Sequence, residues 1–252
     1  MATLPTILRA FIGWSIIALA CGASGAARAA APETVAEADR LAQTGDPSAA
    51  TLRRALELYE RAATANARDA TLQLKVAATA LVLGETVKDG ALSWFQRGEQ
   101  AARRAVELDA RSAEGHFLIA ANRGRAAKLL PVWKVSPTIV GQIEKDLLRA
   151  LAIDPRHARA LHMEGVLLHK TPAPLRVFLD GKRSDVERYL TSAIEADPDY
   201  APARLDLAEY YLEEKRPAEA RAQARAVLAL KSDRSRRYKP EAEALLRRLS
   251  AS

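Results

Sequence analysis

Apolar and small residues recur along this chain at spacings of three and four, which is the period of an amphipathic helix. One such stripe holds Ala55, Tyr59 and Ala62, and another holds Leu190 and Ala193. Alternating β-branched runs with hairpin turns do not occur in the sequence. The pattern therefore predicts an all-α chain, with helices over about 33–44, 48–66, 69–83, 89–108, 112–129, 137–153, 157–169, 185–196, 201–214, 217–231 and 239–250.

The helical pattern repeats along the chain. Ala105–Ala110, Ala150–Pro155 and Ala193–Pro198 each end a helical stretch at Asp followed by Ala or Pro, with degenerate copies at Ala62–Ala67 and Val227–Ser232. Proline cannot continue a helix and moves the preceding residue out of α geometry. A further helical pattern follows each stop, so we expect helix pairs that stack one after another.

Successive copies end 43, 45, 43 and 34 residues apart, so the middle copies hold extra residues. Loops are the usual place for such additions. The segments Gly84–Leu92, Lys128–Val140 and His169–Arg183 each contain Gly or Pro, and we expect the loops there.

The first residues have the layout of a targeting segment. Met1–Arg9 carries one positive charge, Ala10–Cys21 is apolar, and small residues follow. This order is typical of a secretory signal peptide. An A-x-A cleavage site ends at Ala29, so the sequence predicts a leader over residues 1–29 and a periplasmic or secreted protein.

Two alternatives for the leader stay open. An uncleaved leader would anchor the chain, although its apolar run is shorter than the roughly 20 residues of a membrane span. Cys21 follows Ala18-Leu19-Ala20, which loosely resembles a bacterial lipoprotein box. Cys21 is therefore a candidate for lipidation, and membrane association is expected only in these two alternatives.

Positive charge gathers at the two ends of the chain. The formal net charge is +7, of which the leader supplies +2 and Lys231–Ser252 supplies +4. The body is nearly neutral, so the sequence does not favour a nucleic-acid partner. Leu245, Leu246 and Leu249 share one helical stripe near the C-terminus. We therefore predict a solenoid over residues 30–232 and a basic capping helix over 233–252.

The sequence contains no recognisable catalytic or metal-binding constellation. The sequence has four histidines and twelve glycines. It contains no H-E-x-x-H pattern, no Gly-rich phosphate loop and no G-x-S-x-G elbow. One cysteine allows neither an internal disulfide nor a multi-cysteine zinc site. We therefore predict a non-enzymatic protein without a metal or cofactor.

The pattern A-x3-aromatic-x2-A-x4-P resembles the second helix of a tetratricopeptide repeat. Ala55, Tyr59, Ala62 and Ala67 fit three of its four positions, and the other copies fit more loosely. The resemblance implies a right-handed α-solenoid in which the first helix of each pair lines the concave side, where partners bind. Counting along those helices gives the candidate binding residues Phe117, Arg125, Arg159, His162, His169 and Lys170.

One branch of that family resembles the middle of the chain more closely. His116–Arg125, a long insertion, Leu147–Pro155, Gly165 and Pro172 look like the periplasmic T component of TRAP transporters. This resemblance implies association with a periplasmic solute-binding protein. Two functions are thus expected from the sequence: an exported scaffold that binds a protein or peptide, or a ligand-holding accessory of a TRAP-type transporter.

Overall fold

The computed structural model describes residues 33–43, 47–131 and 134–251 of the chain. The predicted leader over residues 1–29 and the lipidation candidate Cys21 lie outside these ranges. Every regular element in the described part of the chain is a helix, as the sequence predicts. The helices are α1 (33–42), α2 (Ala49–Ala65), α3 (Ala70–Thr86), α4 (Ala91–Leu108), α5 (Ala113–Lys128), α6 (Pro137–Ile153), α7 (Ala158–Lys170), α8 (Ala173–Arg176), α9 (Val186–Ala196), α10 (Ala201–Glu213), α11 (Pro217–Ala229), α12 (Asp233–Arg236) and α13 (Lys239–Ala251).

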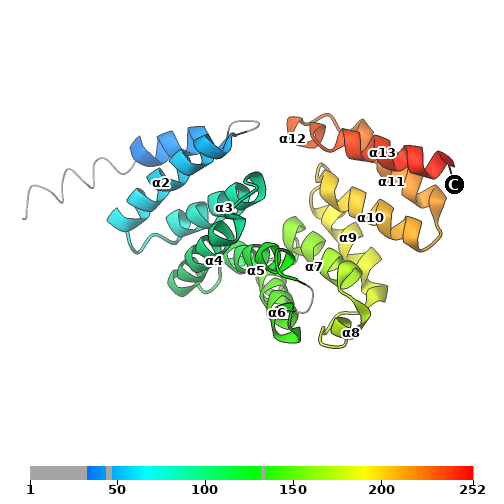
Figure 1. Cartoon of the computed structure of the whole chain (residues 1–252), viewed down its shortest axis with the longest axis horizontal. Coiled ribbons are helices and arrows are strands. Elements are labelled where there is room, and N and C mark those ends of the chain that lie inside the picture. Colours follow the sequence, from blue (N-terminus) through cyan, green and yellow to red (C-terminus); the bar gives the residue numbers. More distant parts are fainter. Residues whose placement is uncertain (1–32, 44–46, 132–133, 252) are drawn as a thin grey trace, which may run out of the picture.

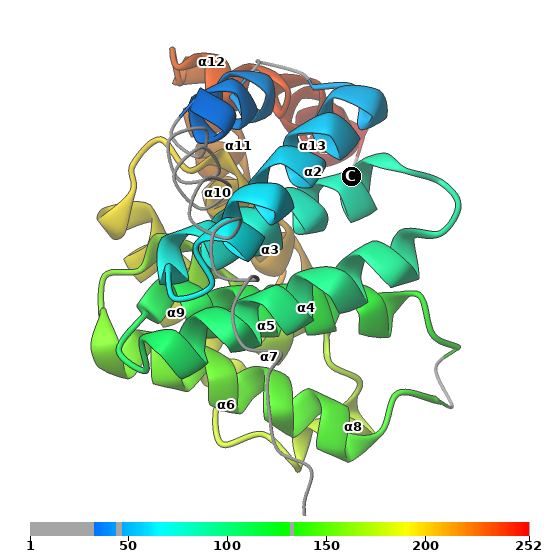
Figure 2. The same cartoon turned by 90° about the vertical axis from the view of Figure 1, so that its left-hand side faces the viewer.

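The helices form an α-solenoid of stacked pairs. The first helices of the pairs are α1, α3, α5, α7 and α10, and the second helices are α2, α4, α6, α9 and α11. Figure 1 shows the pairs following a curve with α4, α6 and α8 on its outer side, and Figure 2 shows α3, α4 and α6 stacked one below another. The prediction of an all-α solenoid is confirmed.

Small and branched residues at the predicted stripes form the core between helices. Ala55, Leu147, Ala150, Leu190 and Ala193 are all fully buried. One apolar cluster runs from α1 to α7, and a second runs from α7 to α13. Each pair therefore buries its apolar side against the next pair, as expected for stacked repeats.

The predicted helix stops have a common geometry. Asp109, Asp154 and Asp197 are the C-terminal capping residues of α4, α6 and α9. Each carboxylate accepts a hydrogen bond from the backbone N–H two residues further on. This turn leaves the helical path without a glycine and starts the next first helix within a few residues.

One local prediction, the loop over Gly84–Leu92, is wrong in its bounds. Helix α3 continues through Gly84 to Thr86, so the predicted loop over Gly84–Leu92 is shorter. A Cβ at Gly84 would lie 2.5 Å from the ring of Phe95. Gly84 therefore allows a close helix approach and does not break the helix. The extra residues of the later pairs do lie in connections, which contain the short helix α8.

The C-terminal helix covers the last pair. Helix α13 packs against α11 and buries Ala242, Leu245 and Leu249. The opposite side of α13 carries exposed charged residues, so the helix has the one solvent-exposed polar face that a terminal element needs.

The predicted division of the chain into a leader that ends before residue 30, a solenoid that ends at residue 232 and a capping helix that starts at residue 233 stays a prediction. Among the described residues, no helix combines the length and hydrophobicity needed to cross a membrane.

Candidate functional site

The first helices of neighbouring pairs are joined by ion pairs on the inner side of the curve. Asp39 near the end of α1 pairs with Lys75 of α3, and Glu85 of α3 lies 2.6 Å from Nε of Arg125 on α5. Glu114 of α5 in turn lies 2.5 Å from the guanidinium of Arg159 on α7. The partners are about 40 residues apart in sequence, so stacking of the pairs brings them together.

The predicted cations of the groove are present but paired. The side chains of Arg125, Arg159 and Lys170 are 47, 45 and 43 % exposed. Lys170 lies 3.1 Å from Glu209 and 3.3 Å from Glu213, both on α10. The positive charge of these three side chains is therefore largely offset by carboxylates of the neighbouring pairs.

His162 of α7 links its helix to α10 and to the turn before it. Its Nε2 lies 2.7 Å from Oδ2 of Asp206, and its Nδ1 lies 3.2 Å from the hydroxyl of Tyr200. Burial raises the pKa of Tyr200 to about 12. The phenol stays protonated near neutral pH, so this Asp–His–Tyr chain provides hydrogen bonds and no activated nucleophile.

His169 and Phe117 lie beneath the groove surface instead of on it. The His169 side chain is fully buried, and its Nε2 lies 2.8 Å from Oε2 of Glu213. Phe117 is 6 % exposed, and the guanidinium of Arg159 lies 4.7 Å from its ring centre. Both residues therefore support the cations above them and are not available for direct contact with a partner.

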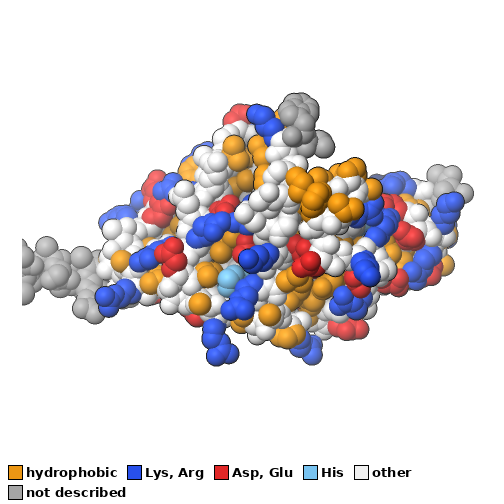
Figure 3. Space-filling view, turned by 90° about the horizontal axis from the view of Figure 1, so that it is seen from below, with side chains coloured by type: hydrophobic (Ala, Val, Ile, Leu, Met, Phe, Trp, Pro, Cys, Tyr) orange, Lys and Arg blue, Asp and Glu red, His pale blue; other side chains and the backbone are white. Residues whose placement is uncertain are grey.

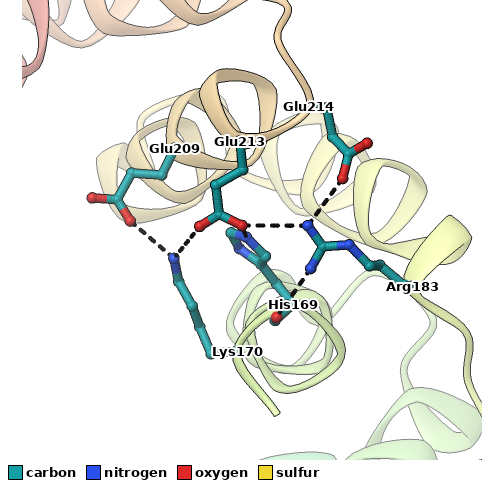
Figure 4. Close-up of polar contacts among 6 residues, drawn as sticks. All are labelled: His169, Lys170, Arg183, Glu209, Glu213 and Glu214. Atoms are coloured by element: carbon teal, nitrogen blue, oxygen red, sulfur yellow. Dashed lines mark hydrogen bonds and ion pairs between the residues drawn. The ribbon is translucent and has the colours of Figure 1, made fainter. Parts of the chain in front are cut away.

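Glu213 is the centre of a polar cluster at the ends of α7 and α10 (Figure 4). It receives hydrogen bonds from His169, Lys170 and Arg183. Partial desolvation acts to raise the pKa of Glu213, but these donors, with His169 first among them, hold that pKa at about 2. The carboxylate thus stays charged and fixes the relative position of the two helices.

One further cation, Lys128 on α5, lies near these residues and is not among the predicted site residues. Lys128 has no ion-pair partner among residues 33–43, 47–131 and 134–251. Desolvation lowers its pKa, and the nearby positive charges of Arg125 and Lys170 lower it further. Lys128 lies three residues after Arg125 on one helix face, at the end of the predicted helix over 112–129, so helical spacing could have found it.

We call the surface around Arg125, Lys128 and Lys170 the concave centre. Asp206 and Glu85 also act on the charge of Lys128, although they belong to the fifth and second pairs. Residues of four successive pairs thus face one another there, as expected on the inner side of a curved solenoid. Desolvation first, and then the charges of Arg125 and Lys170, outweigh the carboxylates of Asp206 and Glu85 in lowering the pKa of Lys128.

The outer side of the curve carries charges of both signs. Figure 3 shows this side with Lys and Arg side chains interspersed with Asp and Glu and with hydrophobic patches.

Among the described residues, no group of three or more His, Cys, Asp or Glu side chains is placed to hold a metal ion. The absence of catalytic activity, of a cofactor and of a metal stays a prediction for the whole chain.

Comparison with known proteins agrees with this architecture. Residues 178–249 match a family model described as tetratricopeptide repeat. The structure is similar to that of a thermophilic TPR protein of Thermus thermophilus, with 23 % sequence identity, 85 % of this chain and 99 % of that chain covered, and a TM-score of 0.64. The fold is that of a tetratricopeptide repeat (TPR) protein.

A second similar structure is MamA, from residue 41 to its end, of Desulfovibrio magneticus RS-1. It has 12 % sequence identity, covers 83 % of this chain and 95 % of its own, and has a TM-score of 0.53. A comparison with curated protein sequences gave no match. At these identities the solved structures establish the TPR fold and leave the ligand open.

Proposed function

We propose that this chain is an exported, non-catalytic TPR scaffold that binds an acidic segment of a protein or peptide partner at the concave centre. The observation that carries the proposal is Lys128, a cation without an ion-pair partner in the described part of the chain, with like charges beside it. A cation in this position is stabilised when a carboxylate binds. TPR solenoids offer an extended inner surface suited to a bound segment.

The proposed location in the periplasm rests on the sequence alone. The leader-like residues 1–29 support export. A single cysteine, which lies inside that leader, is compatible with an oxidising compartment. The alternative of a T-component-like accessory of a TRAP transporter, with a solute-binding protein as its partner, stays a prediction from the resemblance.

Charge reversal at Lys128 tests the proposed function. We expect Lys128→Glu to weaken capture of the partner from a periplasmic extract by at least about tenfold, because it places a carboxylate opposite an acidic segment. Bound proteins are quantified by mass spectrometry on immobilised protein. Lys145→Glu makes the same charge change at an exposed position on the outer helix α6 and is the matched control.

The salt dependence of capture adds a second readout. Binding through Lys128 should weaken as ionic strength rises, because exposed charges are screened within about 10 Å at 0.1 M salt. If Lys128→Glu and Lys145→Glu reduce capture equally, or if neither does, the acidic segment does not bind at the concave centre.

A further inference from the structure

A pocket lies where two turns between pairs meet the C-terminal region. It has a volume of about 380 Å3, which is within the usual range for small-ligand sites. The walls come from the α6–α7 turn, the α9–α10 turn, the first residues of α7 and α10, and the segment from α12 to the start of α13. We call it the turn pocket; its charged and aromatic lining residues are Asp154, Arg156, His157, Arg159, Asp197, Asp199, Tyr200, Arg234, Arg237 and Tyr238.

Two of the four arginines in the turn pocket already have carboxylate partners. Arg159 pairs with Glu114 at 2.5 Å, and Arg234 pairs with Asp197 at 2.6 Å. Asp199 lies 3.9 Å from the same guanidinium of Arg234. These two arginines therefore add little net attraction for an incoming anion.

The other two arginines carry uncompensated charge. Within the part of the chain that the structure describes, neither the guanidinium of Arg156 nor that of Arg237 has a carboxylate partner. The Arg156 guanidinium makes only a long contact of 3.4 Å with the backbone oxygen of Glu195. Arg237 donates to the hydroxyl of Tyr238 at 2.8 Å and lies over its ring. Both guanidinium groups retain donors that can bind an anion.

Helix α10, which begins at the turn pocket, adds to the attraction of the pocket for an anion. Tyr200 is the N-terminal capping residue of α10, and its side chain makes no capping hydrogen bond. The positive end of a thirteen-residue helix therefore faces the pocket beside Arg156 and Arg237. Tyr200, Tyr238 and Pro202 supply flat, largely apolar walls next to these charges.

The aspartates decide which anion fits. Asp154, Asp197 and Asp199 leave the pocket lining with a net formal charge of only about one positive unit. A dianionic phosphate would meet three nearby carboxylates, whereas a carboxylate carries a single charge and matches the planar fork of a guanidinium. The lining therefore favours a carboxylate that is attached to an apolar or aromatic group.

We propose that the turn pocket is a second binding site, separate from the concave centre, that holds a carboxylate next to an aromatic or apolar group between Arg156 and Arg237. Such a carboxylate can belong to a small organic acid or to the free C-terminus of a peptide. The site goes beyond the proposed function, because it can be occupied whether or not a partner binds at the concave centre.

N-acetyl-L-phenylalanine is the probe, since it carries one carboxylate beside an aromatic ring. We expect it to shift the amide NMR signals of Ala158 and Ala201, which line the pocket, during titration of 15N-labelled protein. The neutral N-acetyl-L-phenylalaninamide should cause no comparable shifts, and inorganic phosphate should bind at least about tenfold more weakly than the carboxylate.

The double variant Arg156→Gln/Arg237→Gln should weaken binding of the probe at least about tenfold, equivalent to about 1.4 kcal/mol. Arg225→Gln removes the same charge from an exposed position on α11 and should leave the affinity unchanged. Lys128→Glu should also leave it unchanged, so a failure of the concave centre and a failure of the turn pocket are distinguishable. A matching circular dichroism melting curve checks that each variant is folded.

A tripeptide that ends in phenylalanine with a free carboxylate distinguishes the two sources. Tighter binding than N-acetyl-L-phenylalanine identifies a chain end as the ligand, and equal binding identifies a small acid. The proposal is overturned if the amide or phosphate binds as well as the carboxylate, if no pocket signal shifts, or if the double variant keeps the wild-type affinity.

Discussion

Replacing Glu164 by glutamine should raise the stability of this protein at pH 8 by about 3 kcal/mol and change it little at pH 5. Glu164 lies on α7 and is fully buried, and both of its carboxyl oxygens lack a hydrogen-bond partner among the described residues. Burial, and then the nearby charge of Glu144, raise the pKa of Glu164 to about 8.

The sign of the effect follows from proton binding. The folded protein keeps the Glu164 proton up to about pH 8, whereas the unfolded chain releases it near pH 4.5. Stability is therefore highest below the unfolded value and is lost as pH rises toward 8. Glutamine cannot ionise, so it removes this loss while keeping the size of the side chain.

The carboxylate of Glu144 is the nearby charge that raises the pKa of Glu164. Both oxygens of Glu144 already accept hydrogen bonds of 2.9 Å from the backbone N–H groups of Asp180 and Gly181. This fixed negative charge holds the connection after α8 against α6 and disfavours a second charge at Glu164.

Urea unfolding at pH 5 and pH 8 measures the Glu164 effect. Glu195→Gln, at an exposed position on α9, is the matched control and should keep the wild-type pH dependence. Identical pH dependence of the wild type and Glu164→Gln would contradict the assignment of a neutral carboxyl to the folded protein.

Replacing Gly98 by alanine should lower the free energy of unfolding by about 1–3 kcal/mol, although alanine is the better helix former. A Cβ on Gly98 of α4 would lie 2.2 Å from Oδ1 of Asn122 on α5. Asn122 is fully buried and donates a hydrogen bond of 2.9 Å to the backbone oxygen of Leu118, so it has little room to move.

The double variant Gly98→Ala/Asn122→Ala should recover most of that loss, because it removes the side chain that the new methyl group meets. Gly124→Ala is the control: its Cβ would approach closely, at 2.8 Å, the flexible end of Met163 and would be in ordinary contact with Ile143, so we expect a small change. Thermal unfolding compares the four proteins. An equal loss in Gly98→Ala and in the double variant would mean that the two helices do not approach at Gly98.

The helices of this protein could be read from the sequence with few errors. Asp154 and Asp197 end α6 and α9 at the predicted positions, because a carboxylate that accepts a nearby backbone N–H followed by proline is a local signal. The sequence does not show that Gly84 lies within α3, because its role depends on the ring of Phe95 in the next helix. Local signals in the sequence therefore predict where most helices begin and end. The error at Gly84 arises because a contact between two helices decides the outcome there.

The candidate site could be predicted only in part, for the same reason. Arg125, Arg159 and Lys170 lie on the first helices as expected. Their carboxylate partners lie about 40 residues away, at positions set by how the pairs stack. The burial of Glu164 likewise depends on the connection after α8. Charge balance across pairs cannot be obtained from the pattern within one helix.

Site-specific photocrosslinking shows directly whether the inner surface of the solenoid binds the partner. Benzoylphenylalanine is placed at Arg125 on the inner helix α5 or at Lys145 on the outer helix α6, both exposed. The proposal predicts one crosslinked partner from the inner position that Lys128→Glu abolishes, and none from the outer position. Crosslinking of the same partner only from Lys145 would contradict it.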